Sequence, residues 1–357
     1  MNFEQSEDRR MLADTLRRYL AEQYDIAARN AVAYEAPFHA PARWGELAEL
    51  GLLQALAPED QGGFGGAGFD IATVFEELGR ALCPEPVLPA LMAQRLLAAA
   101  GADAEALLTG ATHYAVAIGE PEAPWGLDGL TTTAGKSGDG WAVSGRKSVV
   151  YGGHVAETLL VAAQAEGKLA LFAVAAGDAE VTGYGMIDGG GAAELFLDAS
   201  PARLLLADAT DALQDALDAG TLALCAEAVG AMDATRELLV DYLRTRKQFG
   251  RAIGSFQALQ HRAVDLVTEI EQARSITVLA ADALGGPEQS RRVSMAKNLI
   301  GRTAKLVAEE AIQMHGGIAM TWEAAVSHYA KRLVMIDHQL GDTDWHLARV
   351  MADLQAA

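Results

Sequence analysis

A cluster of basic and aromatic side chains stands out in an otherwise acidic chain. Residues 242–260, with the sequence YLRTRKQFGRAIGSFQALQ, combine Arg and Lys with aromatic residues and glycines. The whole chain carries a formal net charge of −20. Guanidinium and ammonium groups gathered at one corner can give a diphosphate several charge-assisted hydrogen bonds. The segment therefore indicates a candidate anion-binding site.

The elements around this cluster are expected to be two helices. From about 213 to 246, Ala, Leu, Val and Met recur at helical spacing. Gly250 and Gly254 interrupt the pattern, and Ser255 is a suitable N-cap for a second helix. Cations at the C-terminal end of a helix also interact favourably with its dipole. A plain capping role is therefore the alternative to an anion site.

Composition restricts the class of protein. Apolar residues make up 51% of the 357 residues, which is ample for a large, mainly helical core. The negative charge argues against nucleic-acid binding, and no apolar run reaches the ~20 residues of a membrane span. The mixed-charge N-terminus is unlike a secretory signal, and Cys83 and Cys225 lie far apart in helical contexts. We expect buried thiols, a cytoplasmic protein, and neither a nucleic-acid nor a membrane partner.

The pattern of apolar residues divides the chain into three blocks. Residues 1–110 show helical periodicity at 3–24, 41–54, 71–82 and 89–100. In residues 111–207, short apolar runs alternate with Gly, Asp and Glu, as in the antiparallel strands of a small barrel or sandwich. Helical periodicity returns in residues 208–357. The predicted fold class is α+β, with a β-domain between two helical domains.

Three motifs resemble those of the acyl-CoA dehydrogenase family of flavoproteins and occur in the same order. They are LGLLQALAPEDQGGFGGAGFDIATVFEELGR from Leu50, RTRKQFGRAIGSFQ from Arg244 and QMHGGIA from Gln313. The resemblance extends over essentially the whole chain. It implies a middle antiparallel β-barrel and a C-terminal four-helix bundle, which is the usual tetramer interface. It also implies FAD as cofactor, an acyl-CoA thioester as substrate, and an electron-transfer flavoprotein or similar acceptor.

The resemblance implies an intact FAD half-site in the C-terminal block. Arg246 matches the Arg that reaches the FAD diphosphate from a neighbouring subunit, and Phe249 packs beside the cofactor. Gln257 matches a Gln that hydrogen-bonds FAD across the interface. The remaining matches lie at the adenosine and diphosphate end of the cofactor: Gln313, Gly316, Gly317 and Thr343. Either Gln, taken alone, could be an ordinary polar helix residue.

The matching half-site in the β-domain is eroded. From Tyr114 the chain reads YAVAIGEPEAPWGLDG, where the family has a Tyr-x-x-Thr strand and a Pro-Gly-x-Gly-Ser-Asp loop. Ala117 replaces the Thr whose hydroxyl meets the flavin ring. Glu120 and Glu122 stand in the loop instead of the Gly-Ser pair, and carboxylates repel phosphates. We therefore expect weak FAD binding from this side.

A second flavin-binding strand of the family is also altered. Val149 stands where a Trp stacks on the flavin, and Tyr151 stands where a Thr follows. A stacked ring and several hydrogen bonds are lost together, each worth on the order of 1 kcal/mol. The alternative is a divergent member that binds FAD through other side chains, such as Trp125 or Tyr151.

The catalytic base of the family is missing at both of its usual positions. In the family, a Glu carboxylate removes the α-proton of the thioester, and its backbone N–H helps to stabilise the enolate. Aligning Thr343 puts Gly341 at the usual position, and counting back from the FG corner puts Gly220 at the second. Asp342 and Glu227 are nearby substitutes. Asp342 could instead cap a helix, and Glu227 could pair with an Arg across the bundle.

Two histidines flank the segment of the missing base. His338 and His346 are eight residues apart, which suits no compact metal site. The chain also lacks the Cys and His spacing of a zinc site. We expect no metal.

Two functions fit these observations. One is a self-sufficient homotetrameric acyl-CoA dehydrogenase that uses Asp342 or Glu227 as its base. The other is a subunit of an α2β2 dehydrogenase, which completes the FAD site of a non-identical partner through Arg246, Gln257 and the QMHGG turn. The family includes such assemblies for bulky CoA thioesters derived from steroid side chains or rings. One intact half-site, one eroded half-site and two vacant base positions favour the second function.

Overall fold

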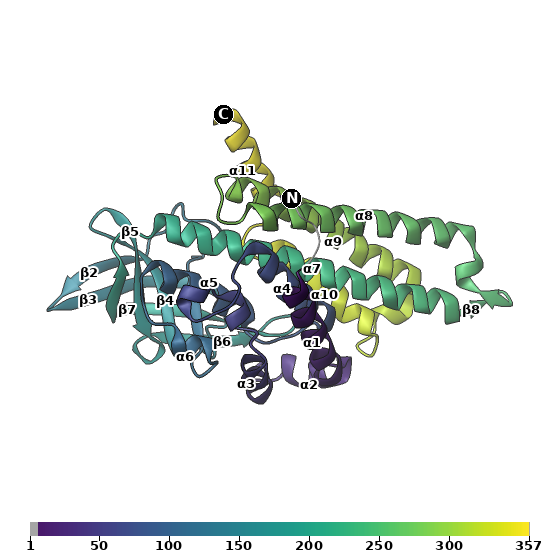
Figure 1. Ribbon diagram of the computed structural model, residues 1–357, viewed down its shortest axis with the longest axis horizontal. Helices are drawn as coiled ribbons and strands as arrows, with labels where there is room; N and C mark the ends of the chain where they lie inside the picture. The colour runs from purple at the N-terminus through teal and green to yellow at the C-terminus, as the bar shows by residue number, and fades with distance from the viewer. Residues whose placement is uncertain (1–5, 357) are drawn as a thin grey trace. The chain divides into compact units, whose positions relative to one another are not determined.

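The computed structural model describes residues 6–356 (Figure 1). The N-terminal helices are α1 (Glu7–Gln23), α2 (Ile26–Ala33), α3 (Pro41–Glu49), α4 (Gly68–Ala81), α5 (Val87–Ala99) and α6 (Glu105–Leu108). The following strands are β1 (Tyr114–Ala117), β2 (Thr133–Ser137), β3 (Gly140–Tyr151), β4 (Thr158–Ala165), β5 (Lys168–Ala175), β6 (Glu180–Gly185) and β7 (Gly191–Leu206). The C-terminal elements are α7 (Thr210–Thr245), β8 (Lys247–Gln248), β9 (Arg251–Ala252), α8 (Gln257–Ala283), α9 (Gln289–His315), α10 (Ala325–His338) and α11 (Thr343–Ala356). Single 3-10 turns lie at Gln54–Leu56, Glu59–Gln61, Ala176–Asp178, Ile253–Ser255 and Gly316–Met320. The predicted order of helices, strands and helices is confirmed.

Helical periodicity located most of the N-terminal helices but not all of their ends. The helix predicted at 3–24 corresponds to α1, and residues 3–5 lie outside the described part of the chain. The helix predicted at 41–54 ends earlier, at Glu49. The short helix α2 was not predicted. Its start is marked by Asp25, whose carboxylate accepts the backbone N–H groups of Ala27 and Ala28 at 2.9 Å each, as N-cap residues do.

The chain forms two compact units that are not continuous in sequence. The first comprises the described residues of Met1–Arg29, Gly68–Cys83 and Thr221–Ala357. The second comprises Asn30–Ala67 and Pro84–Gly220. The division into three domains at about 110 and 207 rests on the order of elements and stays a prediction.

The strands of the second unit close into a barrel. Neighbouring strands follow the order β4-β2-β3-β7-β5, β5 pairs with β4 again, and β6 pairs with β7. The pairings are antiparallel, as predicted, except that β1 and one residue of β2 pair with β4 in parallel. Because side chains alternate along a strand, the inward positions of several strands form one core. This core includes Ala115, Ala117, Val143, Leu159, Val161, Phe172, Val174 and Leu195.

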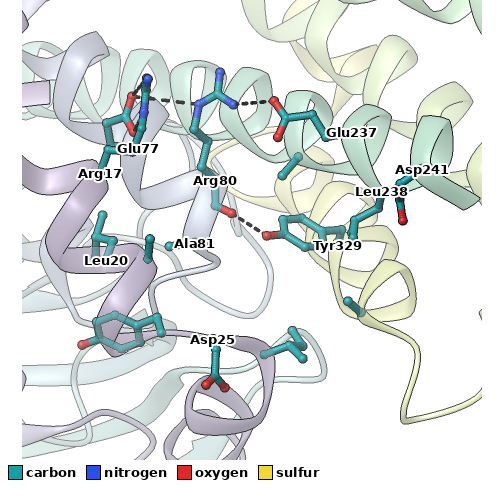
Figure 2. A pocket seen from close by; sticks show the side chains of 15 residues that line it. Arg17, Leu20, Asp25, Glu77, Arg80, Ala81, Glu237, Leu238, Asp241 and Tyr329 are labelled. Carbon is teal, nitrogen blue, oxygen red and sulfur yellow. Dashed lines mark hydrogen bonds and ion pairs between the residues drawn. The ribbon is translucent and has the colours of Figure 1, made fainter. Parts of the chain in front are cut away.

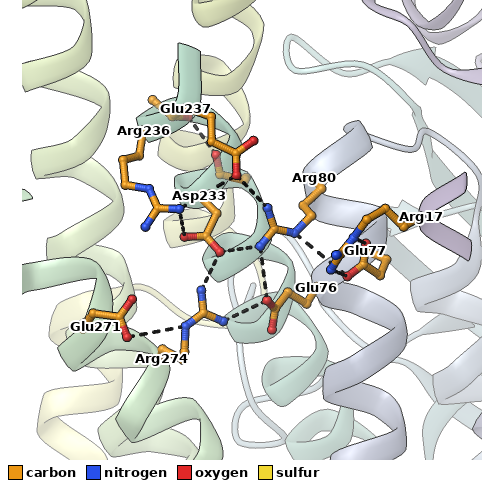
Figure 3. A network of polar contacts seen from close by, with 11 residues as sticks. Arg17, Glu76, Glu77, Arg80, Asp233, Arg236, Glu237, Glu271 and Arg274 are labelled. Atoms are coloured by element: carbon orange, nitrogen blue, oxygen red, sulfur yellow. Dashed lines mark hydrogen bonds and ion pairs between the residues drawn. The ribbon is translucent and has the colours of Figure 1, made fainter. Parts of the chain in front are cut away.

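Helices α4, α7 and α8 of the first unit are joined by a network of charged side chains (Figure 3). Asp233, which is 2% exposed, accepts hydrogen bonds from Arg80 and Arg274 at 2.5 Å each. Arg274 also donates to Glu76 at 2.8 Å. Buried charges are costly unless they are paired, so this network holds the three helices in one arrangement.

Two features of residues 6–356 concern the expected absence of membrane and metal partners. None of the helices there is both long enough and apolar enough to cross a membrane. Within the same residues, His, Cys, Asp and Glu side chains do not form a group of three or more that could hold a metal ion. Cys225 is buried, as expected, whereas Cys83 is only partly buried, so the prediction of two buried thiols is wrong for Cys83.

Candidate functional site

The basic segment forms a hairpin rather than a plain corner between two helices. Strands β8 and β9 pair directly after α7 and leave a turn at Phe249 and Gly250. These two residues have φ of 54° and 78°, and a tight hairpin turn of type I′ needs positive φ at both central positions. The prediction that Ser255 caps the next helix is wrong. It lies in a 3-10 turn and donates to the Ala252 carbonyl at 2.7 Å, and α8 starts at Gln257.

The hairpin and the start of α8 present the predicted FAD contacts to solvent. Arg246 and Gln257 are exposed, and the ring of Phe249 is 91% exposed. The Arg251 guanidinium lies 4.1 Å from the centre of the Phe256 ring, and Phe249 packs edge-on against the same ring. A cation and an exposed aromatic ring side by side can contact both the charged and the planar parts of a nucleotide cofactor.

The Gly-Gly turn lies beside the same end of the bundle. Gly316 and Gly317 follow the last residue of α9, His315, and Gln313 is exposed one turn earlier. The His315 ring stacks on Tyr242 of α7, with 4.5 Å between the ring centres. A Cβ atom at either glycine would meet no heavy atom within 4 Å, so the backbone there is open to close approach by a ligand.

Thr343 lies far from the hairpin and the Gly-Gly turn of the same chain. Its carbonyl accepts a hydrogen bond from Asn298, near the start of α9, whereas Gly316 follows the end of that helix. His315 comes 17 residues after Asn298, which corresponds to about 25 Å along a helix. The Thr343 hydroxyl and N–H both donate to Asp337, at 2.7 and 3.1 Å. Arg246 and Thr343 of one chain therefore belong to different surfaces.

Gly341, which was predicted to stand at the base position, has no room for a side chain. Gly341 lies in the turn between α10 and α11, with a φ of 105° that side chains rarely adopt. A Cβ atom there would clash with the Trp345 ring and lie 2.8 Å from Nε2 of His346. Lys297, which is fully buried, donates to the carbonyls of Gly341 at 2.5 Å and Asp337 at 2.9 Å. The turn is therefore packed and held by α9.

The substitution Gly341→Ala is expected to lower the free energy of unfolding by about 2–3 kcal/mol, from backbone strain and overpacking. Gly285→Ala is the control, because Gly285 has a similar φ of 82° and no heavy atom within 4 Å of a Cβ position. It should cost only about 1 kcal/mol. Chemical denaturation of both variants tests this difference, and equal costs would show that position 341 has space for a side chain.

The two substitute bases have other partners. Asp342 is the N-cap of α11, because its Oδ1 accepts the Trp345 N–H at 2.8 Å. Glu227 is buried in α7, and both of its oxygens accept from Arg332 of α10, at 2.6 and 2.7 Å. Both carboxylate oxygens of Glu227 are therefore already occupied by the Arg332 guanidinium. Gly220, the second base position, lies within α7.

The β-domain positions offer little to a flavin ring. Ala117 is fully buried in the barrel core. Val149 is 39% exposed with a φ of 51°, in a bulge of β3, and its N–H donates to Glu194 at 3.1 Å. Neither side chain can stack on the ring or donate a hydrogen bond. Trp125 and Tyr151, the alternative contacts, are both partly buried.

Glu120 does not face a ligand, and the expectation that it repels phosphate is wrong. It is buried, and Lys147, which is fully buried, donates to it at 2.9 Å. It also accepts the N–H and hydroxyl of Thr131 at 2.7 and 2.6 Å, and the N–H of Thr132 at 3.0 Å. Burial alone would raise the pKa of Glu120, but the bonds from Thr131, Lys147 and Thr132 lower it to about 2. Of the two carboxylates, only Glu122 is exposed and able to repel a phosphate.

This carboxylate uses the donors that could otherwise bind an anion. Two backbone N–H groups, a hydroxyl and an ammonium converge on Glu120. Such a set resembles the nests in which proteins hold phosphate. Here the anion is part of the chain itself, so the loop that carries it is closed to a diphosphate.

A cavity of about 750 Å³ in the first unit contains none of the predicted site residues (Figure 2). Its two guanidinium groups are already paired. Arg17 donates to both oxygens of Glu77, at 2.9 and 2.6 Å, and Arg80 donates to Glu237 at 3.3 Å. Asp241 adds negative charge to the lining. With no spare cation, this cavity does not suit the phosphates of FAD or of CoA.

Two buried lysines, Lys147 and Lys297, were not predicted from the sequence. Both are fully buried, and burial lowers the pKa of each to about 8. The signal was a single lysine within an apolar stretch, in KSVVY for Lys147 and MAKNLI for Lys297. A lone lysine in such a run is rarely buried without polar partners.

Comparison with known proteins identifies the family. Models of the N-terminal and C-terminal domains of acyl-CoA dehydrogenases match residues 6–105 and 210–356. The acyl-CoA dehydrogenase IpdE2 of Mycobacterium tuberculosis is 32% identical over 330 residues, which covers 91% of each chain. A variant of the Tcur3481–Tcur3483 steroid ACAD has a TM-score of 0.90 and 29% identity, covering 98% of this chain and 99% of that one. The ChsE4–ChsE5 complex from Mycobacterium tuberculosis has the same fold, with a TM-score of 0.92, 24% identity and full coverage of both chains. The chain therefore belongs to the acyl-CoA dehydrogenase family, whose cofactor is FAD.

Proposed function

We propose that this chain serves acyl-CoA α,β-dehydrogenation as the completing subunit of a heteromeric enzyme. It contributes Arg246, Phe249, Gln257 and the Gly-Gly turn to the FAD site of a non-identical partner, and the partner contributes the base. The observation that carries this proposal is Gly341, where a side chain has no space, while the adjacent carboxylate of Asp342 caps α11. Glu227, the other buried candidate, is bound by Arg332.

The residues of the two half-sites differ in their fit to FAD. On the C-terminal side, exposed Arg246 would hold the diphosphate and the open backbone at Gly316 would allow close approach. On the β-domain side, Ala117 is buried in the core and the donors of the loop are bound to Glu120. FAD, when bound, supplies the hydride acceptor of the reaction. The proton transfer is assigned to the partner, because this chain presents no free carboxylate at either base position.

The comparisons support the assembly and the substrate class. Two of the similar structures are named for pairs of chains, Tcur3481–Tcur3483 and ChsE4–ChsE5, and the first is named a steroid ACAD. We therefore propose a bulky, steroid-derived CoA thioester as substrate, a tetramer of two kinds of subunit, and an electron-transfer flavoprotein or similar acceptor. The test is to express the chain alone and together with a dehydrogenase encoded by a neighbouring gene. Turnover of a steroid-derived acyl-CoA is expected only from the pair, and turnover by the chain alone would refute the proposal.

The substitution Arg246→Ala is expected to weaken FAD binding to the assembled complex by about 1.5–3 kcal/mol, roughly ten- to a hundredfold in Kd, because it removes charge-assisted hydrogen bonds. Titration of the flavin-free complex with FAD measures this loss. Arg244→Ala is the control, since Arg244 is an exposed cation in the last turn of the same helix. Equal Kd values for both variants and the unmodified complex would show that Arg246 is only a helix-end charge.

A further inference from the structure

Residues 34–40 link α2 to α3 in the second unit. One histidine belongs to this segment, and two others lie beside it. His39 belongs to the segment, and its ring centre lies 5.3 Å from that of His113, just before β1. Nε2 of His154, shortly after β3, lies 2.9 Å from the carbonyl oxygen of Pro37, and its ring packs 5.7 Å from that of Phe38. The segment is therefore held from two sides by imidazole rings.

His154 is placed so that a proton on its second ring nitrogen, Nδ1, would have no partner. A hydrogen bond to the Pro37 carbonyl requires the proton on Nε2, because a carbonyl oxygen can only accept. Nδ1 is buried and has no hydrogen-bond partner. A Cβ atom at Gly191 would clash with the ring and one at Gly183 with the Cβ of His154, so the ring lies directly on the backbone of β7. A proton added to Nδ1 would be buried without an acceptor.

Two carboxylates complete the charged surroundings. Glu85 is buried and accepts from His39 at 3.0 Å and from the Ala40 N–H at 3.0 Å. Glu157 accepts the backbone N–H of His113 at 2.6 Å. Both carboxylates therefore bind backbone N–H groups on either side of the cluster.

We propose that residues 34–40 form an acid-released latch, with His154 as its proton sensor. The latch closes through the bond from neutral His154 to Pro37. Protonation of His154 places a buried N–H without an acceptor beneath the segment, and the segment leaves its position so that this N–H can reach water. The His39–Glu85 pair remains as the hinge side of the segment, because Glu85 contacts His39 and also accepts the backbone N–H of Ala40.

The direction of the pH effect follows from proton binding. Burial, together with repulsion from His39 and His113, lowers the pKa of His154 from 6.5 to about 4 against the opposing bond to Pro37. In a released segment the ring would return to its ordinary pKa. Between these values the released form binds more protons, so closure is fully favourable above about pH 6.5 and weakens as the pH falls. The closing equilibrium is expected to drop about tenfold between pH 7.5 and 5.5.

Hydrogen exchange followed by mass spectrometry tests the latch. Protection of the amides in residues 34–40, corrected for intrinsic exchange, is expected to fall about tenfold from pH 7.5 to 5.5. In His154→Gln, whose amide can donate to Pro37 without titrating, protection should stay nearly constant over this range. His261→Gln, at an exposed histidine of α8, is the control and should behave as the unmodified protein. Protection that is independent of pH in the unmodified protein, or an unchanged pH dependence in His154→Gln, would overturn the proposal.

The state of the His154 ring in the unmodified protein gives a second test, which does not require the variant to fold. NMR of histidine-labelled protein at pH 5.5 should show the His154 ring neutral, with its proton on Nε2. A His154 ring that is mostly protonated at this pH while residues 34–40 remain protected would also overturn the proposal.

Discussion

Glu120→Gln is expected to lower the free energy of unfolding by about 3–5 kcal/mol, because it leaves a buried ammonium without its counter-ion. Within the described residues, Lys147 has no other carboxylate to pair with, because its second hydrogen bond goes to the carbonyl of Ile118, at 2.8 Å. The glutamine amide has only one oxygen, so it could not accept from Thr131, Thr132 and Lys147 together. Urea denaturation at pH 7 measures the change. Glu122→Gln is the matched control, because Glu122 is exposed two residues further on and should change stability little.

Two additional results would support or contradict this account of the pair. Replacing both partners, in Glu120→Gln with Lys147→Met, should recover part of the loss, since no unpaired charge remains. The pKa of Glu120 is lowered from 4.5 to about 2, so the stability that the pair provides should be lost as the pH falls from about 4.5 towards 2. If Glu120→Gln and Glu122→Gln had equal small effects, Glu120 would be free to face a ligand after all.

Glu227→Gln is expected to be the second large change, with a loss of about 3–5 kcal/mol in the free energy of unfolding and little loss of turnover in the assembled complex. Glu227 and Arg332 are side chains with only 9% and 14% exposure, and they share two hydrogen bonds between α7 and α10. The variant leaves the guanidinium partly unpaired. Denaturation measures the first effect, and kcat per folded complex measures the second.

Asp342→Asn is the control for Glu227→Gln. Asparagine also caps helices, so this variant should keep both stability and turnover. A true base would respond differently, because its replacement by an amide would remove turnover by several orders of magnitude without unfolding the chain. Loss of kcat with unchanged stability in either variant would identify that residue as the base and support the homotetramer.

The general architecture could be predicted from apolar periodicity and from motif resemblance. Periods of 3.6 residues marked most helices, and short alternating runs marked the barrel. The parallel pairing of β1 with β4 could not be predicted, because strand direction depends on the path of the chain between strands. The hairpin at Phe249 and Gly250 was also missed, since Phe is an unusual residue at positive φ.

The state of individual side chains was the least predictable part of the site. Glu120 was interpreted as a repelling charge because it stands in the loop where the family binds the diphosphate, yet its counter-ion is Lys147, which is 27 residues away in sequence. The vacancy at Gly341 followed from the motif, but the absence of space there depends on how Trp345 and His346 fold back over the turn. An arginine partner for Glu227 was one of the alternatives, and only the packing of α10 shows that it is Arg332.

The most direct test of the central claim is the FAD content of the purified protein. The completing-subunit account predicts that the chain expressed alone holds little flavin and oxidises no acyl-CoA. Purified with its partner, it should form an α2β2 tetramer that contains two FAD molecules rather than four. A chain that alone binds one FAD per subunit and oxidises an acyl-CoA, with activity lost in Asp342→Asn or Glu227→Gln, would contradict the account.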